Sequence, residues 1–145
     1  MRSKYMLCVL LIAALLTLSS DAEKLSRKSL EHILSEQGFG VLLQGKVRFA
    51  HLGEMKCGSK ILDVYYYTWE ETNPPGRAIH FSQRLIFLEN RTYVGHYVIS
   101  DRPVLVKPDR LRFPVPEEEG NLLRCDKAGL PQSAYIDGGD IVLEK

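Results

Sequence analysis

The sequence predicts a mainly β protein at the margin of α+β: an antiparallel sheet of about eight strands, curled or barrel-like, with one N-terminal helix. Three observations lead to this prediction. Short segments that alternate apolar and polar residues recur from residue 41 to the end of the chain, and this period of two is typical of strands. Gly, Pro, Asn and Asp separate these segments at short intervals. A helical periodicity occurs only before them, in residues 23–37, which favours a small barrel or a curled sheet that carries a helix.

The first 22 residues have the pattern of a secretory signal peptide. Arg2 and Lys4 give a positive start, residues 6–18 are apolar and uncharged, and Ala22 ends a stretch that a signal peptidase can read. An uncleaved membrane anchor is the alternative, but this apolar run is short for crossing a bilayer. We therefore expect cleavage after Ala22, a single β-rich domain over residues 23–145, no stable membrane span after cleavage, and a periplasmic or secreted protein.

Cleavage would also leave the chain electrically neutral. It removes Arg2, Lys4 and Asp21, which takes the formal net charge from +1 to 0. A neutral chain lacks the charge footprint of a protein that binds nucleic acid or an anionic membrane. We therefore expect no nucleic-acid partner. The sequence also carries no cofactor or metal signature, which leaves an unknown protein or small ligand as the expected partner.

Two cysteines, Cys57 and Cys125, remain in the predicted mature chain. An even pair in an oxidising compartment predicts a disulfide bond. Two free thiols or a metal pair are the alternatives, but neither cysteine has a CxxC neighbour or a nearby second ligand. The bond would close a loop of about 68 residues and contribute roughly 4 kcal/mol in the chain-entropy model.

Residues 23–37 are predicted to form the helix. Leu30, Ile33 and Leu34 make a short apolar stripe between polar positions, which is the amphipathic pattern of a surface helix. Gly38 suits the position just after a helix end, and Phe39 could pack back on Leu34 in a Schellman motif. The stripe is expected to pack on the sheet rather than on a partner.

Strand periodicity follows the helix. Residues 41–43 and 47–50 are predicted strand pieces, interrupted by a bulge at Gly45, and Gly53 and Gly58 are expected to mark a turn. Residues 61–69 are predicted to be a central strand because both of its faces are largely apolar. One face carries Tyr65, Tyr67 and Trp69, and the other Leu62, Val64 and Tyr66.

Residues 78–100 are predicted to form a central hairpin that turns at residues 89–92. A three-residue loop would shift the pairing by one residue and turn one strand's faces over. A two- or four-residue loop gives a single register. That register pairs Phe87 with Val94, Leu85 with His96, Arg84 with Tyr97 and His80 with Asp101.

The remaining strands are short and are punctuated by prolines, which suit edge strands. A loop is expected over residues 70–76. Further strands are predicted at residues 104–106, 111–115 and 122–125, with a solvated acidic turn at residues 117–120. A final hairpin is predicted from residues 133–136 and 141–143, joined through Asp137-Gly138-Gly139-Asp140.

His80 and Asp101 are the candidate catalytic pair. In the predicted register they face each other across the hairpin, and a carboxylate can orient and charge an imidazole as a general base requires. No serine or cysteine nucleophile stands in a supporting motif. A purely structural cross-strand pair is therefore the alternative.

Five residues are candidate binding residues. Tyrosine and tryptophan combine an apolar body with a polar tip and are enriched on recognition surfaces, although core packing is the alternative because the same residues favour strands. The helix stripe is too short to cover one whole face of the 61–69 strand, so we expect one aromatic of that face to be partly accessible and to belong to a binding surface. The candidates are Tyr65, Tyr67, Trp69, Tyr97 and Arg84.

Two further short motifs stand in predicted turns. Asp137 and Asp140 flank two glycines, but a calcium ion needs six or more oxygen ligands, so a plain hairpin turn is expected there. Asn90-Arg91-Thr92 is a glycosylation sequon on a predicted exposed turn. Neither motif changes the expected function.

The sequence therefore favours an exported, small β-rich binding module for a protein or a small ligand. Two other classes stay open. One is a small hydrolase-like enzyme that uses His80 and Asp101, and the other is a structural, envelope-associated protein.

Overall fold

The computed structural model describes residues 25–71 and 80–145. The expected signal peptide and most of the loop predicted at residues 70–76 lie outside these residues. The described chain is mostly β, with antiparallel sheets and one α-helix, as predicted. None of the helices in these residues is long and apolar enough to cross a membrane.

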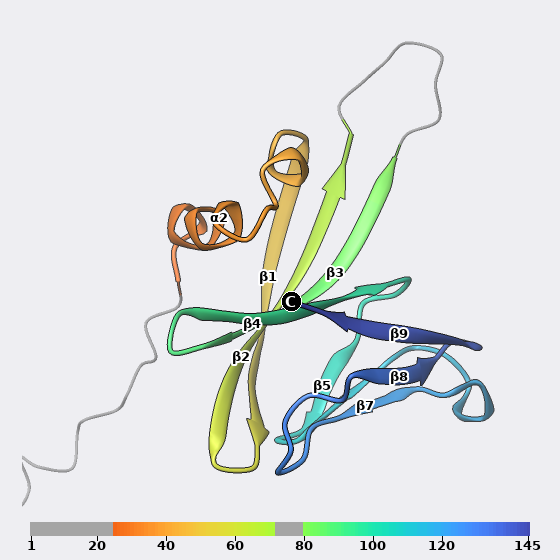
Figure 1. Ribbon diagram of the computed structural model, residues 1–145. Helices are drawn as coiled ribbons and strands as arrows, with labels where there is room; N and C mark the ends of the chain where they lie inside the picture. Colours follow the sequence, from red (N-terminus) through yellow and green to blue (C-terminus); the bar gives the residue numbers. More distant parts are fainter. Residues whose placement is uncertain (1–24, 72–79) are drawn as a thin grey trace, which may run out of the picture.

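In the described part of the chain, nine strands form two sheets (Figure 1). The larger sheet has the strand order β1-β2-β3-β4-β9-β8, and the smaller has the order β5-β6-β7. The elements are α2 (Arg27–Ser35), η2 (Val41–Leu43), β1 (Lys46–Cys57), β2 (Lys60–Glu70), β3 (Phe81–Glu89), β4 (Thr92–Ile99), β5 (Val104–Lys107), β6 (Arg110–Arg112), η3 (Glu117–Glu119), β7 (Leu122–Arg124), β8 (Ser133–Ile136) and β9 (Gly139–Glu144).

The finer prediction, a curled or barrel-like sheet of about eight strands, is not confirmed. The larger sheet does not close within the described residues. After β4 the chain leaves this sheet, builds the three-stranded sheet, and returns as β8 and β9. The detour places a second layer against the first sheet instead of extending it into a barrel.

The larger sheet has an apolar core on each face. One core lies between the two sheets, and the other lies between the larger sheet and α2. Strand β2 contributes Leu62 and Val64 to the first core and Tyr65 and Tyr67 to the second. The prediction of a central strand that is covered on both faces is therefore confirmed. The helix contributes its apolar stripe, Leu30 and Leu34, as expected.

The helix ends are set by local residues. Ser26 caps the start of α2, where its Oγ accepts a hydrogen bond from the Ser29 amide at 3.2 Å. At the other end, the Phe39 amide donates to the Leu34 carbonyl at 3.2 Å, and Gly38 has a φ of +84°. This is the predicted Schellman motif, and Phe39 packs in the same core as Leu34.

The first strand differs from its prediction. Val41–Leu43 forms a 3₁₀ turn and not a strand, and β1 runs through Gly53, which was expected to mark a turn. The bulge lies between His51 and Gly53 rather than at Gly45. A glycine is needed at position 45 for a different reason, because a Cβ there would lie 2.5 Å from the Trp69 Nε1 atom.

The central hairpin follows the predicted register only near its turn. Asn90 and Arg91 both have positive φ angles and form a two-residue loop that pairs Glu89 with Thr92. A bulge then shifts the pairing, so that Leu85 faces Tyr97 instead of His96. The extra residue turns the following side chains over to the other face, so that Tyr93 packs in the helix-side core and Tyr97 in the core between the sheets.

The predicted disulfide joins Cys57 to Cys125. Cys57 ends β1, and Cys125 follows β7, so the bond ties the larger sheet to the smaller one. Beside it, the Lys56 amide donates a hydrogen bond to the Pro108 carbonyl at 2.5 Å. These covalent and polar links hold the two layers together at one end of the molecule.

Candidate functional site

A hollow of about 410 Å³ opens between β4 and β9. The two strands pair only through His96 with Glu144 and Tyr97 with Leu143. Beyond these pairs they diverge (Figure 1), and residues 98–100 and 139–142 form opposite walls. The opening is therefore an interruption in the larger sheet.

Some of the backbone amide and carbonyl groups of β9 point into this opening. The Leu143 amide donates to the Gln132 carbonyl at 2.9 Å, which directs the backbone groups of Leu143 toward the β8 side. Backbone direction alternates along a strand, so the groups of Val142 and Asp140 point toward β4. Within the described residues, no strand pairs with β9 on this side at these two positions. The Val142 carbonyl takes part in the ladder next to the pair of Tyr97 with Leu143, so the Val142 amide and the backbone groups of Asp140 form the unpaired edge inside the sheet.

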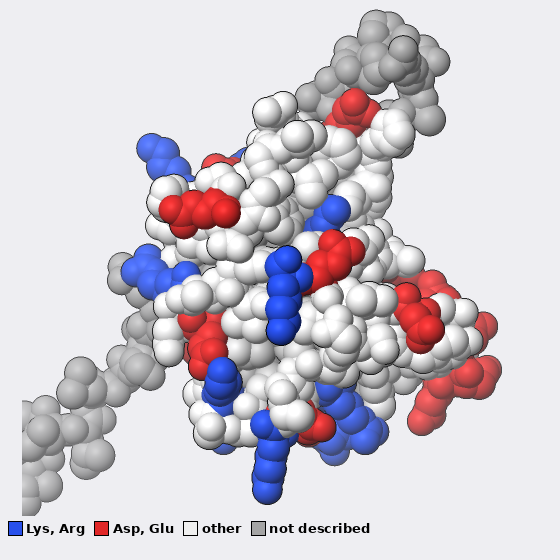
Figure 2. All heavy atoms as spheres, viewed as in Figure 1, with Lys and Arg blue, Asp and Glu red and all other residues white. Residues whose placement is uncertain are grey.

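The side chains of the hollow are apolar and acidic. Val98 and Val142 are exposed large hydrophobic residues, at 43% and 51% of their surface. Asp137, Asp140 and Glu144 add three carboxylates, and none of the lining residues is basic. Figure 2 shows Asp and Glu gathered at the right-hand end of the molecule, where the turn between β8 and β9 lies. A ligand that fits these walls would be partly apolar and positively charged.

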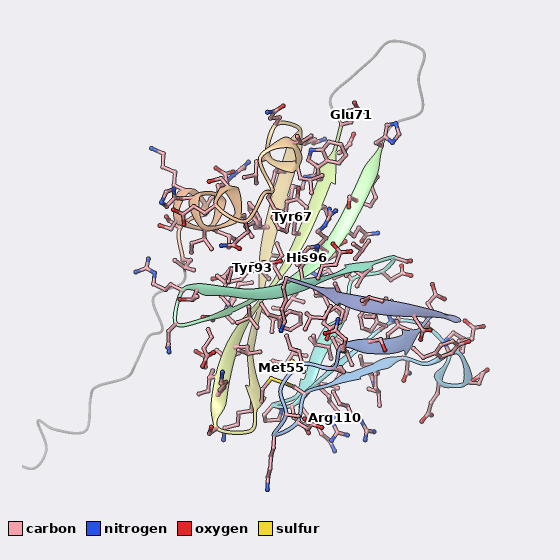
Figure 3. All side chains as sticks on the ribbon, viewed as in Figure 1. Met55, Tyr67, Glu71, Tyr93, His96 and Arg110 are labelled. Carbon is pink, nitrogen blue, oxygen red and sulfur yellow. A yellow bond between two sulfur atoms is a disulfide. The ribbon has the colours of Figure 1, made fainter. Side chains whose placement is uncertain are left out.

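A buried histidine lies where β4 and β9 are still paired, next to the hollow. His96 is 7% exposed; its Nε2 lies 3.2 Å from Oε2 of Glu144, and its Nδ1 lies 2.6 Å from the Tyr93 hydroxyl (Figure 3). Burial lowers the pKa of His96, and Arg84 adds to this, while Glu144 opposes it. Burial also raises the pKa of Tyr93 to about 12. His96 thus lies beside the Glu144 carboxylate, which itself lines the hollow.

Arg84, a predicted binding residue, lies on the helix side of the sheet rather than in the hollow. Its guanidinium carbon lies 5.8 Å from the centre of the Phe39 ring, and one of its nitrogens donates to the Ser82 hydroxyl at 2.5 Å. The Phe39 ring in turn lies 5.0 Å from the His96 ring. Arg84 therefore does not line the hollow, and its charge acts on His96 instead.

The structure does not bring His80 and Asp101 together. The bulge in β4 moves the register by one residue, and the paired part of the hairpin ends at Gln83 and Ile99. Both side chains are exposed, and the Nε2 atom of His80 lies 3.8 Å from a carboxylate oxygen of Glu71 instead. The predicted cross-strand pair is therefore wrong.

Three of the predicted aromatic binding residues lie in the core. Tyr65, Tyr67 and Tyr97 have exposed fractions of 3%, 0% and 0%. The Tyr67 hydroxyl donates to the Leu42 carbonyl, and burial raises the pKa of both Tyr67 and Tyr97. Trp69 is the partly exposed aromatic of its strand face. Its role in binding stays a prediction, whereas the three tyrosines pack the interior.

Asp137 and Asp140 lie where the sequence predicted, at the turn between β8 and β9, and both line the hollow. Within the described ranges no group of three His, Cys, Asp or Glu side chains is arranged to hold a metal ion. The carboxylates of the hollow are suited instead to an organic cation. They stand at separate positions on the walls, so each can form its own ion pair with a basic group of the ligand.

Comparison of the chain with protein-family models, curated proteins and solved structures finds no match. What the chain does is therefore inferred from the site itself.

Sequence reasoning missed the hollow because nothing in the sequence marks where two paired strands diverge. Val98 and Val142 follow the ordinary alternation of strand residues. His96 belongs to a predicted strand, but its burial depends on Phe39 and Glu144, which come from distant parts of the chain.

Proposed function

We propose that this chain is an exported binding module that accepts an extended, cationic peptide segment of a partner protein in the hollow between β4 and β9. The observation that supports this function is the short β4–β9 ladder, which leaves the Val142 amide and the backbone groups of Asp140 unpaired beside an open space. An added strand supplies the missing donors and acceptors, as in other cases of recognition by β-strand addition.

The side chains favour a particular peptide. A strand presents alternate residues to opposite faces, so a bound segment would set one row of side chains against Val98 and Val142. Lysine or arginine in the segment would meet the carboxylates of Asp137, Asp140 and Glu144. Charge complementarity of this kind speeds association and excludes acidic competitors. The proposed ligand is therefore a segment that mixes small apolar and basic residues.

Backbone amide exchange tests this proposal directly. The probe is a synthetic seven-residue peptide of alternating valine and lysine, added to isotope-labelled protein. We expect the amides of Asp140 and Val142 to exchange more slowly with the peptide bound, because they gain hydrogen-bond acceptors. The same peptide with glutamate in place of lysine is the control and should bind at least about tenfold more weakly. Equal binding of both peptides, or protection elsewhere, would contradict the proposal.

A pair of variants at one position separates backbone pairing from side-chain packing. Val142→Pro removes an amide that points into the hollow and leaves the β8 side of the strand unchanged. Val142→Thr keeps the amide and a β-branched side chain. Peptide binding should be lost in the proline variant and largely retained in the threonine variant, with the same circular dichroism spectrum for both. If both variants bind alike, the bound segment does not pair with β9.

The hydrolase alternative lacks support from the geometry. It depended on His80 beside Asp101, and the ion pair of His80 is with Glu71. No particular observation favours a structural, envelope-associated role, so binding is the better-supported function.

Export is the second part of the proposal. It is supported by the N-terminal sequence pattern and is compatible with the disulfide between Cys57 and Cys125. The exported protein should begin at or near Glu23, and its intact mass decides this. A mass that includes residues 1–22 would refute cleavage.

A further inference from the structure

The outer face of the three-stranded sheet carries a row of cations. Leu111 and Leu123 point into the core between the sheets, so the residues next to them in β6 and β7 point outward. Lys107 of β5 pairs with Arg110 of β6, and Arg110 pairs with Arg124 of β7. Three basic residues thus lie side by side across all three strands.

A second row continues the basic face. Arg112 pairs with Val104 on one side and with Leu122 on the other. No outward residue of these three described strands is acidic. Asp109, in the turn between β5 and β6, lies 3.0 Å from Arg110 and offsets part of its charge. The remaining charges face solvent.

This arrangement weakens the sheet. Like charges directly opposite each other on neighbouring strands repel and destabilise the pairing. The structure nevertheless places Arg110 opposite Arg124 and Lys107 opposite Arg110. An anion bound between these side chains would relieve the repulsion, and this relief would favour binding of the anion.

The basic surface extends beyond the small sheet. Lys56 is exposed next to the turn between β5 and β6, where its amide bonds to Pro108, and the exposed Lys127 lies beside Gly58. Figure 2 shows Lys and Arg side chains projecting from the lower end of the molecule, away from the acidic right-hand end. The predicted mature chain is neutral overall, although its basic and acidic side chains lie at different ends of the molecule.

We propose that this basic face binds a linear sulfated polysaccharide. Guanidinium groups offer two parallel donors that match the oxygens of an anionic ester group, and three of the four outward cations are arginines. Neighbouring strands lie about 4.8 Å apart, so one polymer chain can engage several cations at once. The choice of a polysaccharide rests on the proposed export, because polymers of this class occur outside the cytoplasm.

Two other anionic partners fit the face less well. Single-stranded nucleic acids bind where bases can stack on aromatic side chains, and proteins that lie on membranes insert aromatic or long apolar residues. The outward residues of these strands include no aromatic side chain; their apolar members are Val104, Val106 and Leu122. Both partners are included as outcomes of the test.

The experiment measures binding of a fluorescent heparin octasaccharide at low and at physiological salt. The test variant replaces Lys107, Arg110 and Arg124 by serine. The matched control removes the same charge elsewhere, by serine at Lys28, Arg48 and Lys145. We expect the test variant to bind about tenfold more weakly at physiological salt, a few-fold for each exposed ion pair lost, and the control to bind like the wild type. The octasaccharide should also raise the melting temperature of the wild type.

Two outcomes of the binding measurement would contradict the proposal. Equal losses in the two variants would mean that binding depends on overall charge, and the assigned face would be wrong. Tighter binding of single-stranded DNA of the same charge, or of anionic vesicles, through the same residues would also overturn the polysaccharide proposal. If the triple variant does not fold, the single substitutions Lys107→Ser and Arg124→Ser provide the same comparison. The peptide proposal is independent, because the acidic hollow repels this probe.

Discussion

At the scale of single residues, close packing sets requirements that composition does not reveal. Gly45 precedes β1 and lies against Trp69, whose Nε1 atom is buried and has no hydrogen-bond partner among the described residues. A side chain at position 45 would also meet the Glu70 carbonyl. The only tryptophan of the chain therefore reports on this contact.

Gly45→Ala should destabilise the protein by about 1–3 kcal/mol, because the new methyl group forces the indole or the backbone to move. Urea unfolding followed by circular dichroism measures the loss, and Trp69 fluorescence should shift to longer wavelength as the ring moves toward water. Gly139→Ala is the control, since its nearest neighbour would be an Ile136 carbonyl 4.0 Å away. Equal stabilities of the two variants would contradict the expected clash.

His96 should make stability depend on pH. Burial and Arg84 lower its pKa, although Glu144 opposes them. The unfolded chain, with a histidine pKa near 6.5, therefore binds more protons below about pH 6.5 than the folded chain does. The stabilisation from neutral His96 is complete above that pH and is lost as the pH falls through the folded-state pKa. Tyr93, the other group in contact with the ring, stays protonated throughout this range.

Urea midpoints between about pH 5 and pH 8 test this expectation. The wild type should lose stability toward the acid end, and His96→Gln should lose less over the same interval. His32→Gln removes an exposed histidine and is the control, with the slope of the wild type expected. A His96→Gln slope equal to that of the wild type would assign the pH dependence to other groups.

At the scale of the elements, turns and helix ends depend on backbone conformation. Gly38 ends α2 with a φ of +84°, and a Cβ there would have nothing within 4 Å. The cost of a side chain at this position is therefore almost purely conformational. The Asn90-Arg91 turn, in contrast, uses two residues other than glycine at positive φ.

Gly38→Ala should lower the free energy of unfolding by about 1 kcal/mol, because alanine disfavours the left-handed region. Gly40→Ala is a close control: a Cβ there also has open space, and its φ of −49° is helical. Thermal unfolding of both variants gives the comparison. Destabilisation of both by the same amount would point to lost glycine flexibility rather than to the helix end.

At the scale of the whole molecule, one covalent bond links the two sheets. The residues that it joins are 68 positions apart, so the oxidised unfolded chain is strongly restricted. The bond should therefore matter more for overall stability than any single contact between the layers.

Replacement of both Cys57 and Cys125 by alanine should lower stability by roughly 4 kcal/mol and the melting temperature by at least about 10 °C. Scanning calorimetry of the wild type with and without reductant provides a second measurement, since reduction removes the same constraint. The double variant should not respond to reductant. A wild type that melts at the same temperature in both conditions would contradict a stabilising disulfide.

The predictions that succeeded depend on local chemistry or on covalent constraint. Gly38 and Phe39 fit a helix end because that motif involves neighbouring residues only. Cys57 and Cys125 could be paired because they are the two cysteines that remain in the predicted mature chain. Strand β2 was predicted to be central because both of its faces are apolar, and burial on both sides needs such residues.

The remaining features were decided by tertiary structure. The bulge in β4 shifts the register by one residue, which separates His80 from Asp101 and pairs Leu85 with Tyr97. The bulge lies next to Gly95, where β9 approaches so closely that an added Cβ would lie 2.8 Å from the Glu144 carbonyl. The hollow and the basic face likewise combine residues from separate strands, and only the packing of two sheets determines which of them meet. The helix end, the disulfide and the β class could be predicted because they follow from neighbouring residues, from the two cysteines of the predicted mature chain and from strand periodicity. The candidate sites could not, because they depend on contacts between distant residues.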